Sequence, residues 1–459
     1  MAKHSTPSTP PSSPSLASGR KPRSAHEEQL LETAARLLPA GTRNPTMSRE
    51  HAMIVAGARG ARIRDVSGNE YIDYLLGSGP MLLGHAHPAV VAAVRERLED
   101  GSSYLLVSEP AVRLAEKLVE RVPCAERVSL CNSGSEAVAY ALRLARAHRC
   151  RDRILKFEGG YHGQYDPVLM SNQWTWQPAE LPQAVPNSLG IPATVRDEVL
   201  VAPYNDAEAA AELIDRHHDE LGAVIVEPMQ RTFPPRPGFL EAVREATARH
   251  EVPLIFDEVV TGFRLGLGGG QALYGVTPDL CALGKSISAG HPIGVVCGSA
   301  AIMEHAEAVR QVTGGYVSIT GTYSGNPISC AAALASIEVL SQPGVYDRLF
   351  ALGSRLREGL GELLAGAGIP AHLTGEAPAF QVWFGETEPF DHRSAIACDV
   401  MRSMQFTAGL LERGVMKAHE KFFISTAHSD EDIEFTLAAA AEVIAGMAGT
   451  ARTTNTPGA

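Results

Sequence analysis

Lys285 and Asp257 are the two residues of this sequence whose side chains could together act on a carbonyl compound. Asp257 follows the apolar run VPLIF, and Lys285 follows LCALG, 28 positions further along the chain. The carboxyl ends of buried strands form the edge at which open α/β sheets bind ligands. A lysine at that edge is desolvated, so its pKa falls and its free amine can attack a carbonyl. Asp257 alone is more simply explained as a salt-bridged or capping residue. Beside Lys285, it could keep a pyridine nitrogen protonated and complete an electron sink for carbanions.

A second group of residues has the composition of an anion site. Ser133, Gly134 and Ser135 follow the strand-like run RVSL and open a long helical pattern. The first amides of a helix bind phosphate, because they have no intrahelical partner and lie at the positive end of the helix dipole. The same residues also fit an ordinary capping box, with Ser133 as the cap and Glu136 three positions later.

Three further side chains follow strand-like or glycine-rich segments. FEGGYHG contains Tyr161 and His162, and a tyrosine there could stack on a flat cofactor. GTYSGNP offers the Thr322 hydroxyl as a second phosphate contact. Both motifs have simpler explanations, since aromatic residues after strands are commonly core residues and Thr-Gly turns are commonly structural.

The elements that would position these residues alternate along the middle of the chain. Between residues 87 and 330, strand-like runs such as RVSLCN, RILKFEG and AVIVEP alternate with helical patterns such as SEAVAYALRLARAH. This alternation predicts an α/β fold with a mainly parallel sheet and helices on both of its faces. We find no internal repeat.

The two ends of the chain have a different pattern. Apolar residues at helical spacing predict a helix over 26–38, and alternation around Ser67-Gly68-Asn69 predicts a β-hairpin. After residue 330, helical patterns cover 331–340 and 345–366, followed by the strand-like runs HLTGE and AFQVWFG and a last helix that starts at DEDIEF. The C-terminal part therefore reads as α+β, and it could pack with the N-terminal part as a second domain.

We predict five segments. They are a disordered tail at 1–24, an N-terminal part of a small domain at 25–85, a large cofactor-binding domain at 86–335, the C-terminal part of the small domain at 336–449, and a frayed tail at 450–459. The first tail is rich in Ser, Pro and Thr. It lacks the apolar core of a secretion signal, and its prolines oppose the amphipathic helix of a transit peptide.

Composition argues against several classes of partner. The net charge is −12 without a long basic run, so we expect no nucleic-acid binding. The seven cysteines are widely spaced and include no C-x-x-C pair, which indicates reduced thiols and no metal site. No apolar stretch approaches the roughly 20 residues of a membrane helix. We therefore expect a cytoplasmic protein that acts on small molecules, without membrane contact.

Taken together, the motifs resemble those of a known family. GPMLLGHAHP, CNSGSEAVAYALRLARAH, KFEGGYHG, YND, VEP, LIFDEVVTGFR, LGKSISAG and GTYSGNP stand in the order and spacing of class III aminotransferases. Within that family they look most like the glutamate-1-semialdehyde 2,1-aminomutases, and the resemblance runs from about residue 30 to residue 445. It implies the fold type I architecture of pyridoxal-phosphate-dependent transferases, with a mainly parallel sheet of the seven-stranded type and a smaller α+β domain built from both termini.

The resemblance assigns a role to each matching residue. Lys285 would hold pyridoxal 5'-phosphate as a Schiff base and shuttle protons, and Asp257 would pair with the pyridine nitrogen. Tyr161 would stack on the ring. The phosphate would be held by Ser133, Gly134 and Ser135, and second-line contacts near the cofactor would come from His162, Asn205 and Glu227. In such families the threonine of GT-x-SGNP belongs to the neighbouring subunit, so Thr322 implies a homodimer with shared active sites.

Departures from the aminomutase pattern concern the substrate pocket. Met47 stands where an arginine for the substrate carboxylate is expected, and Arg43 and Arg49 lie nearby without the expected spacing. Ser78 replaces an expected tryptophan, which would widen the pocket. The segments that begin at VEPMQRTF and GVMKAHEK are each about three residues shorter than expected. His419 and Glu420 of the second segment have no assigned role.

These departures rank the functional hypotheses. The first is an intermolecular aminotransferase, which passes an amino group from a donor to a keto acid or aldehyde in a ping-pong cycle. The alternative is glutamate-1-semialdehyde 2,1-aminomutase, which forms 5-aminolevulinate. The short second segment weighs against the alternative, because internal exchange depends on retaining a diamine intermediate under a closed lid. A silent cofactor-binding protein ranks last, since Lys285 and Asp257 are both in place.

Overall fold

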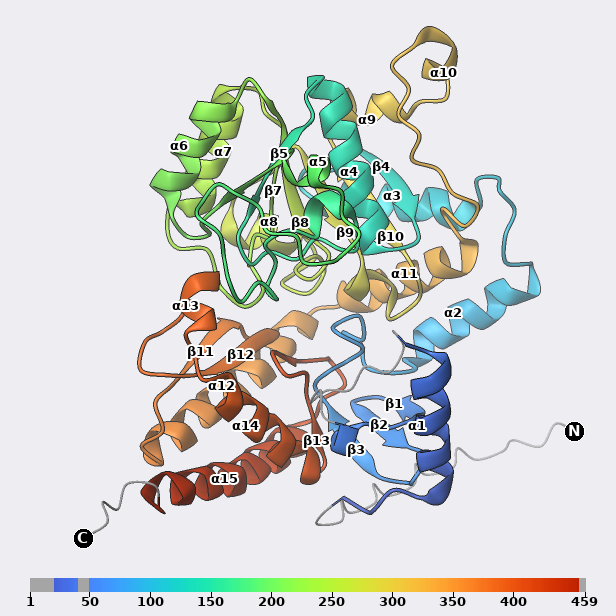
Figure 1. Ribbon diagram of the computed structural model, residues 1–459. Coiled ribbons are helices and arrows are strands. Elements are labelled where there is room, and N and C mark those ends of the chain that lie inside the picture. Colours follow the sequence, from blue (N-terminus) through green and yellow to red (C-terminus); the bar gives the residue numbers. More distant parts are fainter. Residues whose placement is uncertain (1–19, 40–48, 454–459) are drawn as a thin grey trace, which may run out of the picture.

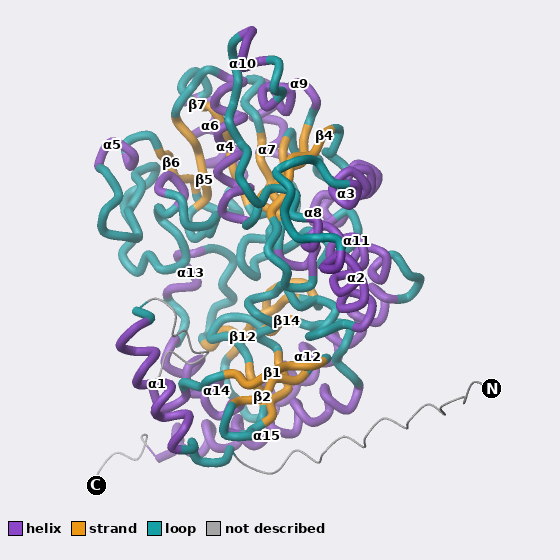
Figure 2. Tube along the Cα trace, turned by 90° about the vertical axis from the view of Figure 1, so that its right-hand side faces the viewer, coloured by secondary structure: helices purple, strands orange, loops and turns teal. Residues whose placement is uncertain are grey.

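The chain forms two packed bodies, and residues 20–39 and 49–453 are described by the computed structural model. Figure 1 shows a larger body above, built from the middle of the chain, and a smaller one below, in which N-terminal and C-terminal segments lie side by side. The view in Figure 2 confirms that α1 (Ala25–Leu37) lies in the same lower body as the C-terminal helices. The small body therefore combines segments that are more than 300 residues apart in the sequence.

A seven-stranded sheet forms the centre of the large body, in the order β4-β10-β9-β8-β7-β5-β6. The five neighbours β9, β8, β7, β5 and β6 run parallel, whereas β10 runs antiparallel to both β9 and β4. This confirms the predicted α/β class with a mainly parallel sheet. The strands are β4 (Arg127–Cys131), β5 (Arg153–Phe157), β6 (Val199–Ala202), β7 (Leu221–Val226), β8 (Leu254–Glu258), β9 (Leu280–Leu283) and β10 (Gly294–Gly298).

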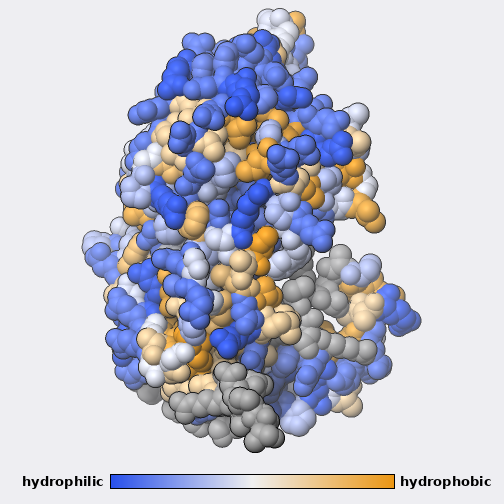
Figure 3. Space-filling model, turned by 60° about the vertical axis from the view of Figure 1, so that its left-hand side comes forward, coloured by the Kyte–Doolittle hydropathy of each residue, from blue (hydrophilic) through white to orange (hydrophobic). Residues whose placement is uncertain are grey.

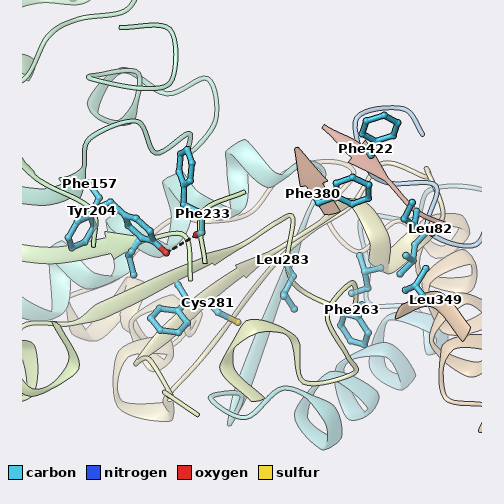
Figure 4. Packing of buried hydrophobic residues seen from close by; sticks show 14 of the residues in the cluster. Leu82, Phe157, Tyr204, Phe233, Phe263, Cys281, Leu283, Leu349, Phe380 and Phe422 are labelled. Carbon is cyan, nitrogen blue, oxygen red and sulfur yellow. Dashed lines mark hydrogen bonds between the residues drawn. The ribbon is translucent and has the colours of Figure 1, made fainter. Parts of the chain in front are cut away.

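Alternate residues of each central strand enter two different cores, as the two-residue period of a strand requires. In β7, Val224 and Val226 pack on one face, together with Phe239 of α7 (Phe239–Arg249). Ala223 and Ile225 pack on the other face, under α4 (Gly134–Arg149). Both faces are covered, which explains why these strands read as continuous apolar runs in the sequence. Figure 4 shows the first core, which continues from Phe157 and Tyr204 towards Phe380 and Phe422 of the small body.

The remaining helices of the large body flank these layers. The longer ones are α2 (Pro88–Glu99), α3 (Glu109–Arg121), α6 (Ala207–His217) and α11 (Pro327–Leu340). Short helical segments are α5 (Ala193–Arg196), α8 (Gly269–Tyr274), α9 (Ala300–Met303) and α10 (Arg310–Thr313), and 3-10 turns cover Asp166–Val168, Lys285–Ser288 and Glu304–Ala306. A further 3-10 turn, Arg49–His51, lies between α1 and β1 of the small body. Helix α11 packs against α2 and α3.

The small body contains two further sheets, of order β1-β2-β3-β13 and β11-β12-β14. Strands β2 and β3 pair antiparallel around residues 66–69, which confirms the predicted hairpin. The strands are β1 (Val55–Arg59), β2 (Arg62–Asp65), β3 (Glu70–Asp73), β11 (Ala371–Glu376), β12 (Ala379–Phe384), β13 (Val415–Met416) and β14 (Phe422–Phe423). The helices are α1, α12 (Val345–Gly366), α13 (His392–Ile396), α14 (Val400–Glu412) and α15 (Asp430–Thr453).

The outer surface is mixed in character. In the view of Figure 3 hydrophilic side chains predominate, with hydrophobic patches concentrated towards the middle of the face. Among the described helices, none alone is both long and apolar enough to cross a bilayer. The pair Pro327–Leu340 and Val345–Gly366 meets the length and composition criteria only jointly, with a bend of 79° between them.

Candidate active site

A cavity of about 390 Å³ lies at the edge of the central sheet where the parallel strands end. We call it the cofactor cavity. It gathers residues from segments that follow β4, β5, β7, β8 and β9, because the carboxyl ends of parallel strands meet at one edge. Its lining includes Ser78, Ser133, Gly134, Ser135, Tyr161, His162, Gln173, Trp174, Glu227, Arg231, Asp257, Lys285 and Glu420. Nine of these residues were singled out as site residues from the sequence.

Lys285 begins a 3-10 turn directly after β9 and lines the cavity. Its φ is +46°, a left-handed conformation that a non-glycine residue adopts only when the surrounding structure holds it. Burial lowers the pKa of its amine, the carboxylate of Asp257 opposes this, and the nearby Arg231 adds to the lowering, so that the pKa falls from 10.5 to about 8. About a tenth of the amine is therefore uncharged and nucleophilic at pH 7, far more than for an ordinary lysine.

This pKa predicts how the cofactor-free protein reacts with an aldehyde. Only the neutral amine attacks a carbonyl, so the rate constant should rise about tenfold per pH unit below pH 8 and level off above it. The measurement is the rate of absorbance change when pyridoxal phosphate is added between pH 6 and pH 11. A rate that still rises above pH 10 would mean that Lys285 behaves as an ordinary exposed lysine.

Asp257 lies near the end of β8 and is 5% exposed. Its Oδ2 is 2.8 Å from Nδ1 of His162, and its Oδ1 accepts a hydrogen bond from the Val259 amide at 3.1 Å. Both contacts fix the orientation of the carboxylate towards the cavity. A carboxylate held in this orientation can stabilise a cation placed opposite it.

The segment Ser133–Ser135 has the geometry of an anion cradle at the start of the 16-residue helix α4. The Ser133 hydroxyl caps the helix by accepting from the Glu136 amide at 3.1 Å, so the capping interpretation holds for this side chain. The carboxylate of Glu136 accepts from the Asn132 amide at 2.7 Å and does not close a reciprocal box on Ser133. The other first-turn amides have no intrahelical acceptor and are available for an anion.

Two glycines allow the segments around this cradle to pack closely together. A side-chain carbon at Gly134 would lie 2.8 Å from Val259, and one at Gly163 would lie 2.5 Å from the Ser135 hydroxyl. Gly163 also has a φ of +101°, which favours glycine. The absence of a side chain therefore lets the backbone pack closely against Val259 at position 134 and against Ser135 at position 163.

Tyr161 forms an aromatic wall of the cavity. Its hydroxyl accepts from the Gln164 amide group at 2.9 Å, and its ring makes an edge contact with Trp174, with centroids 5.5 Å apart. Its backbone amide donates to Glu227 Oε1 at 2.8 Å, and the amide of Arg231 donates to Glu227 Oε2 at 2.7 Å. Glu227 thus positions two cavity residues through their backbones.

An ion pair in the cavity wall was not predicted from the sequence. Arg231 has a φ of +59°, and its guanidinium pairs with the carboxylate of Glu420 from the segment before β14. Burial tends to raise the pKa of Glu420, but Arg231 and Lys421 outweigh it and hold the pKa at about 2. The position of Arg231, five residues after the end of β7, was the available signal. Its partner is 189 residues away, so the contact arises from tertiary structure.

The structure brings Ser78 to the cavity, where it is exposed and has a φ of +69°. It does not bring Asn205 there. The Asn205 amide nitrogen donates to the carbonyls of Pro234 and Phe390, and its oxygen accepts from the Arg236 amide.

Thr322 is exposed in a turn outside the cavity of its own chain. Met47 and Arg43 lie outside the described residues.

Comparisons with known proteins agree with this geometry. The model of the family "Aminotransferase class-III" matches residues 45–419. A glutamate-1-semialdehyde 2,1-aminomutase from Methanothermobacter thermautotrophicus is 41% identical over 427 residues, which cover 92% of this chain and 99% of that protein.

Solved structures show the same similarity. An omega-transaminase from Sphaerobacter thermophilus has a TM-score of 0.86 and 37% identity, with 92% of this chain and 98% of that chain covered. A structure described as a transaminase with PLP bound has a TM-score of 0.84 and 29% identity, with 93% and 98% covered. Because the family model spans most of the sequence and the relatives align over nearly their whole length, this chain belongs to the class III aminotransferase family.

Proposed function

We propose that this chain is a pyridoxal-phosphate-dependent enzyme that moves an amino group between carbon atoms, with the cofactor held on Lys285. The observation that carries the proposal is the cofactor cavity, in which a lysine of lowered pKa, a buried carboxylate and a helix N-terminus lie together. Each of the three matches a different part of the cofactor.

The residues present fit this cofactor. Ser133, Gly134 and Ser135 would hold the phosphate through the first amides of α4, which have no intrahelical acceptor. Asp257 would face the ring nitrogen, and Tyr161 would cover one face of the ring. When bound, the cofactor supplies an electron sink for a carbanion at the substrate carbon. The Lys285 amine would then take the proton from that carbon and return it at a different position.

For the form of the reaction, the curated relatives favour the aminomutase. The relative at 41% identity carries that name, as do others at 38% to 42%. This reverses the order that was predicted from Met47, Ser78 and the two short segments. The segment that carries Glu420, although short, reaches the cavity wall, so its length does not by itself leave the cavity open. We therefore propose glutamate-1-semialdehyde 2,1-aminomutase activity as the first form.

Intermolecular amino transfer is the second form, and a specific observation favours it. Ser78 leaves the cavity wall without a large side chain at this position, so substrates can enter and leave more easily. The 37% identical omega-transaminase supports the same form.

One experiment separates the two forms. The purified holoenzyme is given glutamate-1-semialdehyde alone, and separately a panel of amino donors with keto acids. Formation of 5-aminolevulinate without any external acceptor supports the aminomutase. Turnover that requires an added acceptor supports the aminotransferase. If neither occurs and no amine changes the cofactor absorbance, the proposed function is wrong.

We also propose that the enzyme acts as a homodimer. Leu105, Leu106 and Val107 are 80% to 83% exposed in the single chain, a run of apolar residues of the kind that interfaces cover. The Asn326 side chain donates to the Ser102 carbonyl at 2.8 Å, which ties this run to the turn that contains Thr322. Thr322 would reach the cofactor phosphate of the neighbouring subunit.

A further inference from the structure

Arg264 is among the largest side chains that are fully buried in the described part of the chain. It lies in the turn that follows β8, and no carboxylate of residues 20–39 or 49–453 forms an ion pair with it. Burial lowers the pKa of its guanidinium from 12.5 to about 9, with Tyr346 opposing the shift. A buried cation without a paired carboxylate is costly, so its presence calls for a role beyond stability.

The hydrogen bonds of this guanidinium reach three separate segments behind the wall of the cofactor cavity. Nη2 of Arg264 donates to the Ser286 hydroxyl at 2.9 Å and to the Gly79 carbonyl, and Nε donates to the Val260 carbonyl at 3.2 Å. Val260 itself lines the cavity, and the other two acceptors each directly follow a residue that does, one of them Lys285. A single side chain therefore ties together the segments that follow β3, β8 and β9.

Arg264 is closely packed on both sides of its guanidinium. A side-chain carbon at Gly79, whose φ is +105°, would lie 3.2 Å from Nη2 of Arg264 and 3.2 Å from the Phe423 ring. The guanidinium carbon also lies 4.7 Å from the centroid of that ring, at the distance of a cation–π contact. The guanidinium is thus held between the two bodies, so its hydrogen-bond partners are held as well.

Lys285 needs such support because of its backbone. A non-glycine residue with a φ of +46° keeps this conformation only when neighbouring contacts hold it. Ser286 directly follows it, is fully buried, and has its hydroxyl bonded to Arg264. Loss of the guanidinium would leave this hydroxyl without its donor and the turn without its link to the Gly79 carbonyl.

The charge of Arg264 also acts on the Lys285 amine. Charged groups from several elements face this amine, namely Asp257, Glu227, Arg231, Arg264 and Lys421. Arg264 adds to the lowering of the amine pKa, although burial and Arg231 lower it more. With one cation fewer, protonation of the amine becomes easier, so removal of Arg264 should raise the pKa of Lys285.

We propose that Arg264 is a positioning residue for Lys285, which holds the turn of that lysine in place through the Ser286 hydroxyl and the Gly79 carbonyl. This rests on the proposed function, in which the Lys285 amine carries a proton between two positions. Arg264 does not line the cofactor cavity, so it acts only through its neighbours. Proton transfer depends steeply on placement, and a displacement of about 1 Å can lower a rate about 100-fold.

The first test measures kcat and KM of the holoenzyme with glutamate-1-semialdehyde, or with the donor and acceptor that the wild type converts. Arg264→Met should lower kcat at least about tenfold and change KM by less than about threefold, because substrate binding does not involve this residue. Ser286→Ala removes one acceptor and should lower kcat less. The double variant should be no slower than Arg264→Met, because both changes remove the same contact.

The second test does not depend on turnover. Pyridoxal phosphate is added to the cofactor-free protein at a series of pH values, and the rate of absorbance change is recorded. Arg264→Met should move the midpoint of this profile to higher pH than the wild-type value of about 8. Arg264→Lys keeps the charge but cannot span the same acceptors, so its midpoint should stay while its kcat falls. A role in stability alone would lower the unfolding temperature and leave both midpoints unchanged.

Arg357→Met is the matched control. Arg357 also donates to a backbone carbonyl, that of Gly375 at 2.6 Å, but it lies in the small body and does not line the cofactor cavity. Its variant should keep the kcat and the pH midpoint of the wild type. If Arg264→Met does not fold, the lower kcat of Arg264→Lys and Ser286→Ala, each with an unchanged midpoint, supports the inference.

The inference is overturned if Arg264→Met or, where that protein does not fold, Arg264→Lys keeps the kcat of the wild type. It is also overturned if the effects of Arg264→Met and Ser286→Ala on kcat are additive, since the two residues would then act independently. If the wild type converts neither the semialdehyde nor any donor, the proposed function is wrong. The pH profile of cofactor attachment then still decides the inference, because an unchanged midpoint in Arg264→Met would refute it.

Discussion

Lys285→Ala should lower turnover by at least about 10³-fold, since it removes both the nucleophile and the proton carrier. The protein should stay folded, because the Lys285 side chain lines a cavity and is not part of the hydrophobic core. Alanine would occupy the same left-handed conformation that lysine already tolerates, so little further backbone strain is expected. Turnover with saturating cofactor and the circular dichroism spectrum measure the two effects.

The control for this variant is Lys117→Ala. Lys117 is a half-exposed lysine of α3 that pairs with Glu120 at the surface. Its loss should leave turnover unchanged, because a surface ion pair contributes little. A Lys285→Ala enzyme that kept more than a few per cent of wild-type activity would contradict the assignment.

Asp257→Asn should have the second largest effect. Asparagine has nearly the same shape and can still accept from the Val259 amide, but it carries no charge to stabilise a protonated ring nitrogen. We expect kcat to fall on the order of 10² to 10³-fold, as when one electrostatic contact to a developing charge is lost. The cofactor should still bind through Lys285 and the anion cradle, which its absorbance would show.

Asp215→Asn is the matched control for the charge change. Asp215 is a partly exposed carboxylate that pairs with Arg249 and His250, away from the cavity. The Asp215→Asn protein should keep the kcat of the wild type. If Asp257→Asn also kept normal kcat, the carboxylate would not be serving the ring nitrogen.

Much of the site could be predicted from the sequence, because strand ends are recognisable. Ser133, Tyr161, Glu227, Asp257 and Lys285 each follow or end an apolar run, and parallel strands bring such positions to one edge. The hairpin and the mainly parallel sheet were predictable for a similar reason, since their residues alternate or form continuous runs according to which faces are buried.

Other features depend on contacts that a linear pattern does not contain. Asn205 also follows a strand, but its left-handed backbone and its bonds to Pro234 and Phe390 keep its side chain away from the cavity. Arg231 and Glu420 meet only because the small body packs against the large one.

A lowered pKa alone would not identify the catalytic lysine. Burial also lowers the pKa of Lys156, Lys417 and Lys421, in each case to about 7. The ammonium of Lys156 donates to the carbonyls of Gly160 and Met170, and that of Lys417 donates to the carbonyl of Ala418. Lys421 contacts the Phe423 ring and does not line the cofactor cavity. Among these four lysines, Lys285 alone faces the cofactor cavity.

Reduction of the holoenzyme with borohydride, followed by peptide mapping, tests the assignment most directly. Borohydride reduces the imine between the cofactor and the lysine that holds it to a stable secondary amine. The mass of the peptide that contains this lysine then increases by that of the attached cofactor group. We predict that this peptide contains Lys285, and that the Lys285→Ala protein shows no label. Label on Lys156, Lys417 or Lys421, or on no lysine, would contradict the account.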